Sequence, residues 1–377
     1  MSDAGTESRR SFLTGGLVGA AAGILGAAGA GVFGAETRGS GGPAVHAGET
    51  VKWRLASSFP SSLDTIYGAA EVLRDRVAAM TGGRCGIKVC QQGELVQGLA
   101  VMDAVQSGSI QAGQTAGYYY IGKNPALAFD TCVPFGLTPR QQNAWLFEGG
   151  GLDAVRRLYA DFDIVSFPCG NTGVQMGGWF RQPVETLADL KGLRMRIPGL
   201  GGHVMNALGV TVQVLAGGDI YPALERGAID ATEWVGPYDD EKLGFWQVAK
   251  HYYYPGWWEP GPSLSFLVNR GAWAALPAEY REVFTAASHE AASAMQTRYD
   301  EKNPAALQRL IGHGVELRPF SDAILGGARE AATAFMNDQA TRDATYRTIL
   351  EGWRKFRAAS FKWFSTAELA YSHFAWR

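Results

Sequence analysis

The chain has 377 residues, enough for about two domains, and its 46% hydrophobic and 19% charged residues are typical of a globular protein with a sizeable core. Its formal net charge of −2 at pH 7 gives no electrostatic reason to expect nucleic acid or an anionic membrane as a partner. The six histidines and four cysteines form no zinc-ligand or nucleophile motif, so the sequence offers no positive sign of a zinc site or of nucleophilic catalysis.

Residues 1–47 are expected to form an export signal. Arg9 and Arg10 begin a twin-arginine pattern, and a weakly hydrophobic segment rich in glycine and alanine follows over residues 15–35. This composition favours the twin-arginine route, and an uncleaved membrane anchor is the alternative. Cleavage after Ala47 competes with earlier Ala-x-Ala sites, and the mature protein is expected in the periplasm.

The next segments alternate between strand and helix periodicity. Short alternating runs predict strands, while apolar residues spaced three and four apart predict helices. The expected strands cover residues 51–56, 86–90 and 110–116, and the expected helices cover residues 62–80 and 99–107. This β-α-β-α-β order predicts a mostly parallel sheet with helices on both faces.

A second copy of this pattern occurs in the middle of the chain. Residues 104–112 resemble residues 223–231, and in both a helix ends at a glycine directly before a buried strand. The elements before the second copy are a strand at 193–197, a helix at 202–208 and a strand at 211–215. The repeated order predicts two similar α/β lobes, with a ligand cleft at the carboxyl ends of the strands.

The cysteines do not indicate a disulfide framework. Cys85 and Cys90 lie in one expected strand, where their Cα atoms would be about 16 Å apart, beyond the reach of a disulfide. The sequence leaves open whether Cys132 and Cys169 pair.

The last third of the chain is expected to be helical. The predicted helices cover residues 277–299, 304–313, 321–338 and 342–358, and the first two open on a proline, which suits the first helical position. An aromatic-rich segment follows at 361–376. Its apolar residues need a packing partner, and a second subunit is as good a candidate as the parent chain.

Arg196 is the first candidate for ligand binding. In the strand at 193–197 it shares a face with Arg194, opposite Met195, and it lies at the strand end before a Pro-Gly turn. An arginine in that place is suited to clamp a carboxylate with two hydrogen bonds. The alternative is a solvated arginine on an edge strand, but the two-lobe organisation favours the cleft.

A second candidate window runs over residues 171–181. Asn171 and Gln175 offer amide groups, and the glycines around them allow the backbone to approach a ligand closely. The window matches no phosphate-binding loop. The alternative is a glycine-rich strand that crosses between the lobes.

A third group consists of oxygen donors. The carboxylates of Glu233 and Glu259, the side chain of Gln175 and the backbone carbonyl of Trp234 could hold a hard cation such as Na⁺ or Ca²⁺. The two glutamates could instead form an acid–base pair of an extracytoplasmic enzyme acting, for example, on a glycan. A third reading pairs both glutamates with arginine or lysine.

The chain resembles the DctP-type solute-binding subunits of TRAP transporters over essentially its whole mature length. The most specific segments are residues 187–196, 223–231 and Asn269 with 275–277. Within the family the chain is most similar to the α-keto acid-binding branch. The segments that carry this similarity are residues 115–120, 170–181, 233–245 and 252–259.

The resemblance implies a two-lobed periplasmic binding protein fold of the α/β class, with an interlobe cleft and long C-terminal helices. It implies capture of a small 2-oxo acid of the pyruvate or 2-oxobutyrate type, without catalysis, for sodium-dependent uptake through TRAP membrane subunits. Lactate or another 2-hydroxy acid is the alternative ligand, and a sensor domain with the same fold is an alternative role. The sequence does not decide which acid is bound.

The resemblance also implies roles for single residues. Arg196 would form the salt bridge to the substrate carboxylate, and Asn171 and Tyr118 would complete the pocket. A cation, Na⁺ or alternatively Ca²⁺, would lie beside the substrate. Its ligands would be Gln175, Glu233, the Trp234 carbonyl and Glu259. The branch is associated with homodimers that exchange a C-terminal helix, and nothing suggests a nucleic-acid partner.

The expected domain organisation follows from these readings. Residues 1–47 form the signal, and residues 346–377 form a C-terminal helical segment for dimerisation. Lobe I is expected to comprise residues 48–170 and 262–300. Lobe II is expected to comprise residues 171–261 and 301–345.

Overall fold

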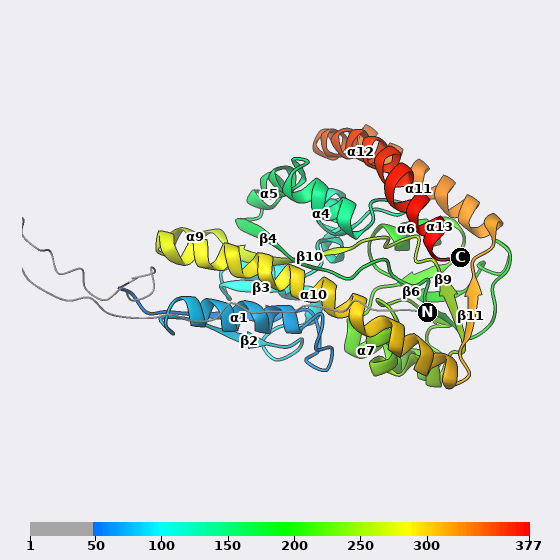
Figure 1. Ribbon diagram of the computed structural model, residues 1–377, viewed down its shortest axis with the longest axis horizontal. Helices are drawn as coiled ribbons and strands as arrows, with labels where there is room; N and C mark the ends of the chain where they lie inside the picture. The colour runs from blue at the N-terminus through cyan, green and yellow to red at the C-terminus, as the bar shows by residue number, and fades with distance from the viewer. Residues whose placement is uncertain (1–47) are drawn as a thin grey trace, which may run out of the picture. The chain divides into compact units, whose positions relative to one another are not determined.

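The computed structural model describes residues 48–377, so the expected export signal and its cleavage site lie outside the described residues. Two β-sheets form the framework, and helices pack around them (Figure 1). The first sheet has five strands in the order β2-β1-β3-β10-β4, and the second has six in the order β11-β9-β5-β8-β6-β7. The α/β class predicted from the sequence is confirmed.

The first sheet is mostly parallel, with one antiparallel strand. Its strands are β1 (Val51–Ser57), β2 (Cys85–Cys90), β3 (Ala112–Thr115), β4 (Ile164–Asn171) and β10 (Ser263–Asn269). β1 pairs in parallel with β2 and β3, but β10 lies antiparallel between β3 and β4. β1, β2, β3 and β4 therefore all run in the same direction, which confirms the expectation of a mostly parallel sheet; β10 is the exception, because it returns from the second sheet and enters the first from the opposite direction.

Helices flank the first sheet. They are α1 (Gly68–Met80), η1 (Gly98–Ala100), α2 (Val101–Gln106), η2 (Gly117–Tyr120), η3 (Pro125–Leu127), α3 (Ala128–Thr131), α4 (Pro139–Phe147) and α5 (Gly151–Ala160). The predicted helix at 62–80 begins only at Gly68, since the residues before it form turns. One residue of these turns, Ile66, lines a cavity in the folded protein.

The second sheet repeats the core of the first. Its strands are β5 (Trp179–Phe180), β6 (Arg194–Arg196), β7 (Thr211–Gln213), β8 (Ala231–Thr232), β9 (His251–Tyr254) and β11 (Glu316–Pro319). β6 pairs in parallel with β7 and β8, just as β1 pairs with β2 and β3. The second copy of the β-α-β-α-β pattern, which was predicted from the sequence, is therefore a structural repeat.

The repeat includes the helix ends and the glycine turns that precede β3 and β8. Helices around the second sheet are α6 (Gly199–Ala207), α7 (Gly217–Glu225), α8 (Pro237–Leu243) and η4 (Phe245–Gln247). α2 and α7 end just before Gly108 and Gly227, whose φ angles are 73° and 70°. Only glycine adopts such angles without strain, so both helices stop there and the chain turns directly into β3 or β8.

The chain crosses between the sheets at residues 172–178 and again at residues 255–262. We call these stretches the crossing segments. The Gln175 N–H donates to the Glu259 carbonyl at 3.2 Å, and the Gly256 N–H donates to the Gln175 carbonyl at 2.9 Å. The glycine-rich window around Gln175 is therefore a crossing between the sheets.

The C-terminal third is helical, as predicted, with one correction. Its helices are α9 (Arg270–Ala275), α10 (Ala278–Gly312), α11 (Asp322–Arg342), α12 (Ala344–Phe364) and α13 (Ala370–Ala375), with a π-turn at Ser365–Leu369. The two helices expected on either side of Pro304 are one continuous helix, α10. Pro304 costs a backbone hydrogen bond, but packing on both sides of it keeps the helix intact.

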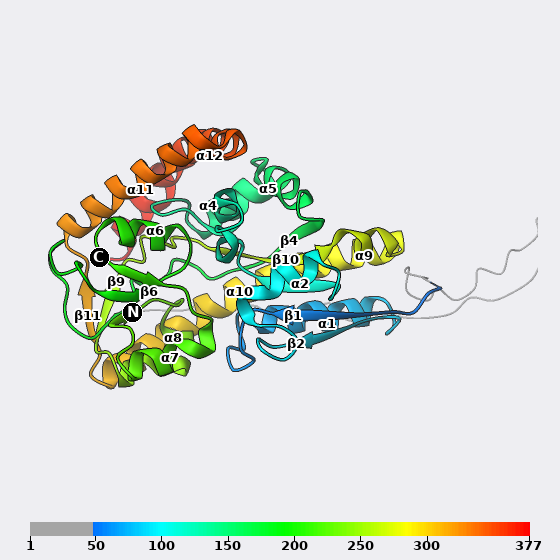
Figure 2. The same cartoon turned by 180° about the vertical axis from the view of Figure 1, so that it is seen from behind.

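Helix α10 runs along both sheets (Figures 1 and 2). It packs against α1 and β4 of the first sheet and against α8 of the second. Next to Pro304, the Asn303 side-chain oxygen accepts a hydrogen bond from the Tyr238 N–H at 3.0 Å. These contacts explain why local propensity at the proline is overridden.

Two sequence questions are answered by the fold. All four cysteines are free and buried, so Cys132 and Cys169 do not pair. Within residues 48–377, no helix is both long and apolar enough to cross a membrane.

Candidate functional site

Arg196 is the last residue of β6 and lies at the centre of the candidate site. β6 is an inner strand, and the Arg196 side chain is 1% exposed, so the alternative of a solvated arginine on an edge strand is wrong. Its Nε donates to the Leu215 carbonyl at 3.1 Å, and its Nη1 donates to the Glu233 carbonyl at 3.1 Å and forms an ion pair with the Glu233 carboxylate. The guanidinium also lies 5.2 Å from the ring centre of Trp234. The arginine is thereby held rigidly.

Three polar atoms around Arg196 have no hydrogen-bond partner in the described part of the chain. They are Arg196 Nη2, Glu233 Oε2 and Gln175 Oε1, and all three are buried. An unpaired buried polar atom is costly, so such atoms in a native protein require an explanation. One donor and two acceptors together fit an anion that meets the arginine and a cation that meets the oxygens.

Glu233 and Glu259 bring two carboxylates into this buried region. Glu233 follows β8, while Glu259 lies in the second crossing segment and accepts a hydrogen bond from the Tyr118 hydroxyl at 3.3 Å. Burial raises the pKa of Glu233, although the Arg196 guanidinium opposes this rise. Burial, and then the charge of Glu233, raise the pKa of Glu259 well above its ordinary value. The sequence reading in which both glutamates pair with arginine or lysine holds for Glu233; among the described residues, no ion pair forms at Glu259.

The electrostatic surroundings of Arg196 also favour the binding of an anion. Burial alone would lower the pKa of its guanidinium, but the Glu233 carboxylate and the neighbouring tyrosine hydroxyls raise it above the ordinary value. The guanidinium is therefore a permanent positive charge in a dry site. Such a charge is strongly attractive to an anion that can reach it.

A small cavity of about 10 Å³, room for about one water, lies beside these groups. Its lining residues are Phe59, Ile66, Tyr118, Tyr119, Thr172, Gln175, Arg196, Trp234, Val235, Pro262 and Leu264. Both sheets and both crossing segments contribute to this list. Four residues predicted from the sequence, Tyr118, Gln175, Arg196 and Trp234, are thus brought together around one cavity.

Asn171 does not line this cavity. Its side-chain nitrogen donates to the Gly261 carbonyl at 3.0 Å, and its oxygen accepts from the Gly173 N–H at 3.0 Å. The amide therefore joins the two crossing segments at the end of β4. A direct contact between Asn171 and a ligand stays a prediction.

Several lining residues were missed by the sequence reasoning. Tyr119 lies in a run of three tyrosines, and its position beside Tyr118 was an available signal. Phe59 follows the end of β1 much as Arg196 ends β6, so the strand-end rule could have found it. Ile66 and Leu264 look like ordinary core residues and carry no such signal.

The donor set fits a hard cation better than a transition metal. Within residues 48–377, no three His, Cys, Asp or Glu side chains come together as a metal cluster. Gln175, Glu233, Glu259 and the Trp234 carbonyl supply oxygen only, which suits Na⁺ or Ca²⁺. The unpaired Gln175 Oε1 and Glu233 Oε2 are the structural observation in favour of such an ion.

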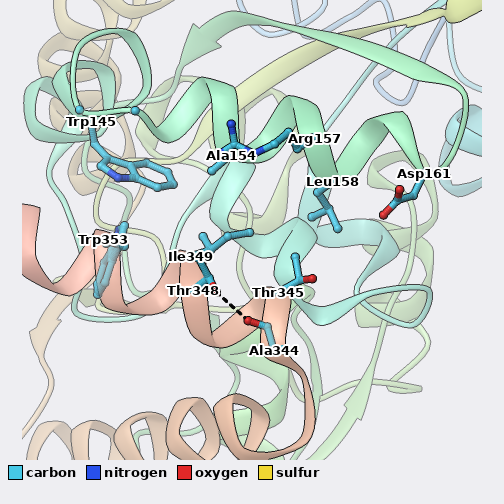
Figure 3. A pocket seen from close by; sticks show the side chains of 13 residues that line it. Trp145, Ala154, Arg157, Leu158, Asp161, Ala344, Thr345, Thr348, Ile349 and Trp353 are labelled. Atoms are coloured by element: carbon cyan, nitrogen blue, oxygen red, sulfur yellow. Dashed lines mark hydrogen bonds between the residues drawn. The ribbon is translucent and has the colours of Figure 1, made fainter.

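A larger groove of about 590 Å³ lies between α5 and α12, and Arg196 is not among its lining residues (Figure 3). The rings of Trp145 and Trp353 line one end, Arg157 and Asp161 belong to the other, and Thr348 Oγ1 donates to the Ala344 carbonyl at 2.9 Å. None of the buried unpaired polar atoms lines this groove. The groove therefore lacks the buried, unpaired polar atoms that are found at the Arg196 cavity.

Comparison with known proteins gives a consistent set of relatives. Residues 56–343 match the family model DctP, described as bacterial extracellular solute-binding protein, family 7. A protein of Nostoc sp. described as a monocarboxylate 2-oxoacid-binding periplasmic protein is 54% identical over 325 residues, which cover 86% of this chain and 89% of the relative.

Two crystal structures illustrate the structural likeness. A TRAP transporter solute-binding protein from Bordetella bronchiseptica, a mixed-occupancy dimer with co-purified calcium and picolinate, has a TM-score of 0.86 and 46% identity, over 87% of this chain and 98% of that one. A TRAP periplasmic solute-binding protein from Pseudoalteromonas atlantica, with bound sodium and pyruvate, has a TM-score of 0.84 and 37% identity, over 86% and 99%. The predicted two-lobed fold is confirmed by these likenesses.

Proposed function

Because the chain belongs to the DctP family, the periplasmic solute-binding proteins of TRAP transporters, we propose that it captures a small 2-oxo monocarboxylate such as pyruvate. Membership of this family of binding proteins also settles the choice between binding and catalysis in favour of binding. The substrate class rests on one observation above all. Arg196, buried beside the cavity, keeps an unpaired Nη2 next to the unpaired oxygens of Gln175 and Glu233.

A 2-oxo acid has the chemistry to use these atoms. Its carboxylate would accept hydrogen bonds from the Arg196 guanidinium, and its keto oxygen is a further hard ligand for a cation. The relatives support this assignment, since the Nostoc protein is described as 2-oxoacid-binding and the P. atlantica structure holds pyruvate.

We propose that Na⁺ or Ca²⁺ binds at Gln175, Glu233, the Trp234 carbonyl and Glu259. A cation bound to Glu233 and Glu259 would favour their ionised forms, which burial disfavours, and would offset the negative charge that the ligand carboxylate adds beside Arg196. Burying charge that is not compensated is costly, so a cation is what allows the anion to enter. The B. bronchiseptica relative carries calcium, and the P. atlantica relative carries sodium.

We propose the lobe boundaries on the basis of the sheets. Lobe I would comprise residues 48–170 and 262–300, and lobe II residues 171–261 and 301–345. Strand β4 ends at Asn171 and β10 begins at Ser263, close to the proposed boundaries. Ligand capture between the lobes would then present the closed protein to the TRAP membrane subunits.

We also propose a homodimer built through residues 346–377. The last part of this segment exposes large apolar side chains, which are Trp363, Leu369, Tyr371, Phe374 and Trp376. Two of them, Leu369 and Trp376, line a groove of about 940 Å³ that the start of α4 also borders. Exposed apolar surface of this kind favours a protein partner, and the B. bronchiseptica relative crystallised as a dimer. Sedimentation of the Phe374→Asp variant tests this, with a shift toward monomer expected.

Export by the twin-arginine route is the remaining part of the proposal. It rests on Arg9 and Arg10 and on the apolar segment that follows them. Fusion of residues 1–47 to a reporter that folds before export, with Arg9→Lys and Arg10→Lys together as the control, tests the route. Export of the control as efficient as that of the native signal would count against it.

The substrate class is tested by a screen on the purified mature protein. Melting temperature is measured with pyruvate, 2-oxobutyrate, lactate, a dicarboxylate and neutral sugars, and mass spectrometry identifies any ligand carried through purification. We expect 2-oxo acids to raise the melting temperature and to be recovered unchanged. A protein that responds to none of the carboxylates would contradict the proposal.

A further inference from the structure

The cavity beside Arg196 has two chemically different sides. One side presents Arg196 Nη2 and Gln175 Oε1, which have no partner in the described residues. The other side is apolar and is formed by Phe59, Ile66 and Leu264, each at most 2% exposed. We call these three residues the apolar wall.

The wall comes entirely from the elements of the first sheet. Phe59 follows β1, Ile66 lies in the turn before α1, and Leu264 belongs to β10. Arg196, in contrast, ends a strand of the second sheet. A ligand between the two sides would touch one sheet with its polar end and the other with its apolar end.

Phe59 is fixed in place by its own backbone. Its N–H donates to Ser57 Oγ at 3.1 Å, and its carbonyl accepts from the Gln92 N–H at 3.1 Å. Its ring meets the Trp234 ring edge to face, with the centroids 6.3 Å apart. The Trp234 ring also lies against the Arg196 guanidinium. Trp234 is therefore packed between Phe59 and Arg196.

The other two wall residues are equally well held. The Ile66 carbonyl accepts a hydrogen bond from Gln114 Nε2 at 2.6 Å. Leu264 lies where the pairing of β10 with β4 shifts register, between Leu264 and Ser265. The extra residue at this irregularity, Cys169, lies in β4, so β10 keeps its regular alternation: Leu264 lines the cavity, and Ser265 Oγ donates to Asp130 Oδ1 at 2.9 Å.

We propose that the apolar wall, with Phe59 as its principal member, sets the chain length of the acid that this protein accepts. The inference rests on the proposed function, since it concerns which 2-oxo acid fits the same cavity. The carboxylate and keto oxygen would be held by the polar groups around Arg196 and Gln175, so the alkyl group is left to face the wall. A cavity of about 10 Å³ holds about one water, so even pyruvate must displace part of the lining, and each further methylene has to displace more of the wall.

The magnitude follows from hydrophobic pocket chemistry. One methylene more or less in such a pocket changes affinity by about 10- to 200-fold. The wild-type protein should therefore prefer pyruvate or 2-oxobutyrate to 2-oxovalerate by at least about 10-fold. Truncating Phe59 removes the largest side chain of the wall and should relieve this penalty.

The test is calorimetry with pyruvate, 2-oxobutyrate, 2-oxovalerate and 4-methyl-2-oxovalerate on the wild type and on Phe59→Ala. The measured quantity is the ratio of Kd values for 2-oxovalerate and pyruvate, because a ratio does not depend on the fraction of folded protein. We expect this ratio to fall by about 10-fold or more in Phe59→Ala. Phe59→Leu is measured in parallel and gives a smaller change, which keeps the test informative if the alanine variant does not fold.

Phe266→Ala is the matched control. Phe266 is a fully buried phenylalanine in β10 that does not line the cavity. Its truncation should lower the melting temperature and leave the ratio unchanged.

Each outcome has a separate meaning. If both Phe59 variants keep the wild-type ratio while still binding pyruvate, the wall does not set chain length and the inference is overturned, although the proposed function stands. If the wild type binds none of the four acids, the proposed function itself is wrong. A ratio that changes equally in Phe266→Ala would also overturn the inference, because the effect would then come from general loosening of the core.

Discussion

Arg196 and Glu233 form an ion pair in which each side chain is only 1% exposed to solvent. The pair is incomplete, because Arg196 Nη2 and Glu233 Oε2 are both left without a partner in the described structure. A buried pair contributes little to stability by itself, since desolvation offsets the attraction between the charges. Its arrangement is better understood as preparation for a ligand that satisfies the two remaining atoms.

Arg196→Ala should abolish ligand binding. Removing one partner from a buried, hydrogen-bonded charge pair costs several kcal/mol, so we expect Kd for pyruvate to rise at least about 100-fold by calorimetry. Arg194→Ala is the control, because Arg194 lies on the same strand but is 44% exposed and pairs with Asp230. Its affinity should stay within about 2-fold of wild type. Near-wild-type affinity of Arg196→Ala for every 2-oxo acid would rule out the clamp.

Glu259→Gln should weaken cation binding and, through it, ligand binding. The substitution keeps the shape of the side chain but removes one of the two carboxylate charges available to the ion. Elemental analysis of the purified protein measures calcium, and titrations in sodium- and potassium-based buffers measure dependence on Na⁺. Glu241→Gln, at a carboxylate paired with Arg309, is the control. Unchanged ion content and ion dependence in Glu259→Gln would remove the cation from the proposal.

Asp64→Asn should speed ligand release. Asp64, in the turn before α1, accepts hydrogen bonds from Lys242 Nζ at 2.5 Å and the Tyr238 hydroxyl at 3.0 Å, both from α8 beside the second sheet. These bonds join the two sheets outside the cavity. Since exposed ion pairs contribute up to about 1 kcal/mol, the dissociation rate should rise up to about 5-fold by stopped-flow, with less effect at high salt.

The control for this junction is Glu290→Gln. Glu290 pairs with Arg76 at 2.7 Å, and both residues belong to elements packed on the first sheet. Its removal should leave the dissociation rate unchanged. Equal rates for Asp64→Asn and wild type would show that this junction does not slow ligand release.

Asp239 and Asp240 should make stability depend on pH. Burial raises the pKa of Asp239 to about 7 and that of Asp240 to about 6, from a usual value of 3.8. The native state therefore keeps protons that the unfolded chain has lost, so stability falls as pH rises from about 4 to about 7. Asp239 also accepts hydrogen bonds from Tyr299 and Trp234, which place it behind the cavity.

Calorimetric unfolding between pH 4 and pH 8 measures this effect. In Asp239→Asn the fall of melting temperature with rising pH should become shallower, because asparagine cannot ionise. Asp219→Asn, at an exposed carboxylate, should keep the wild-type slope. A slope in Asp239→Asn equal to that of wild type would assign the pH dependence to other groups.

The sequence predicted the functional core because strand ends obey a general rule. Arg196 and Glu233 lie at or just after the ends of parallel strands, and parallel strands bring such residues to one edge. Phe59, Ile66 and Leu264 escaped because they come from three separate segments and resemble any buried apolar residue. Their grouping depends on how the end of β1, the turn before α1 and the start of β10 meet in the folded chain, which no local pattern reveals.

Two features of the fold were also beyond sequence reasoning. Pro304 reads locally as a helix start, yet packing of α10 against both sheets carries the helix through it. β10 lies antiparallel between β3 and β4, although most strands of the second sheet separate it from them in the sequence. Both outcomes are decided by tertiary contacts rather than by local preference.

The crossing segments have a mechanical consequence. They carry Gln175 and Glu259, and two backbone hydrogen bonds already join them. A cation held by both side chains would add a third link between the crossing segments. Ion binding would then stiffen these segments, so slower amide exchange at Gln175 and Gly256 would report a loaded protein without any change in its outer surface.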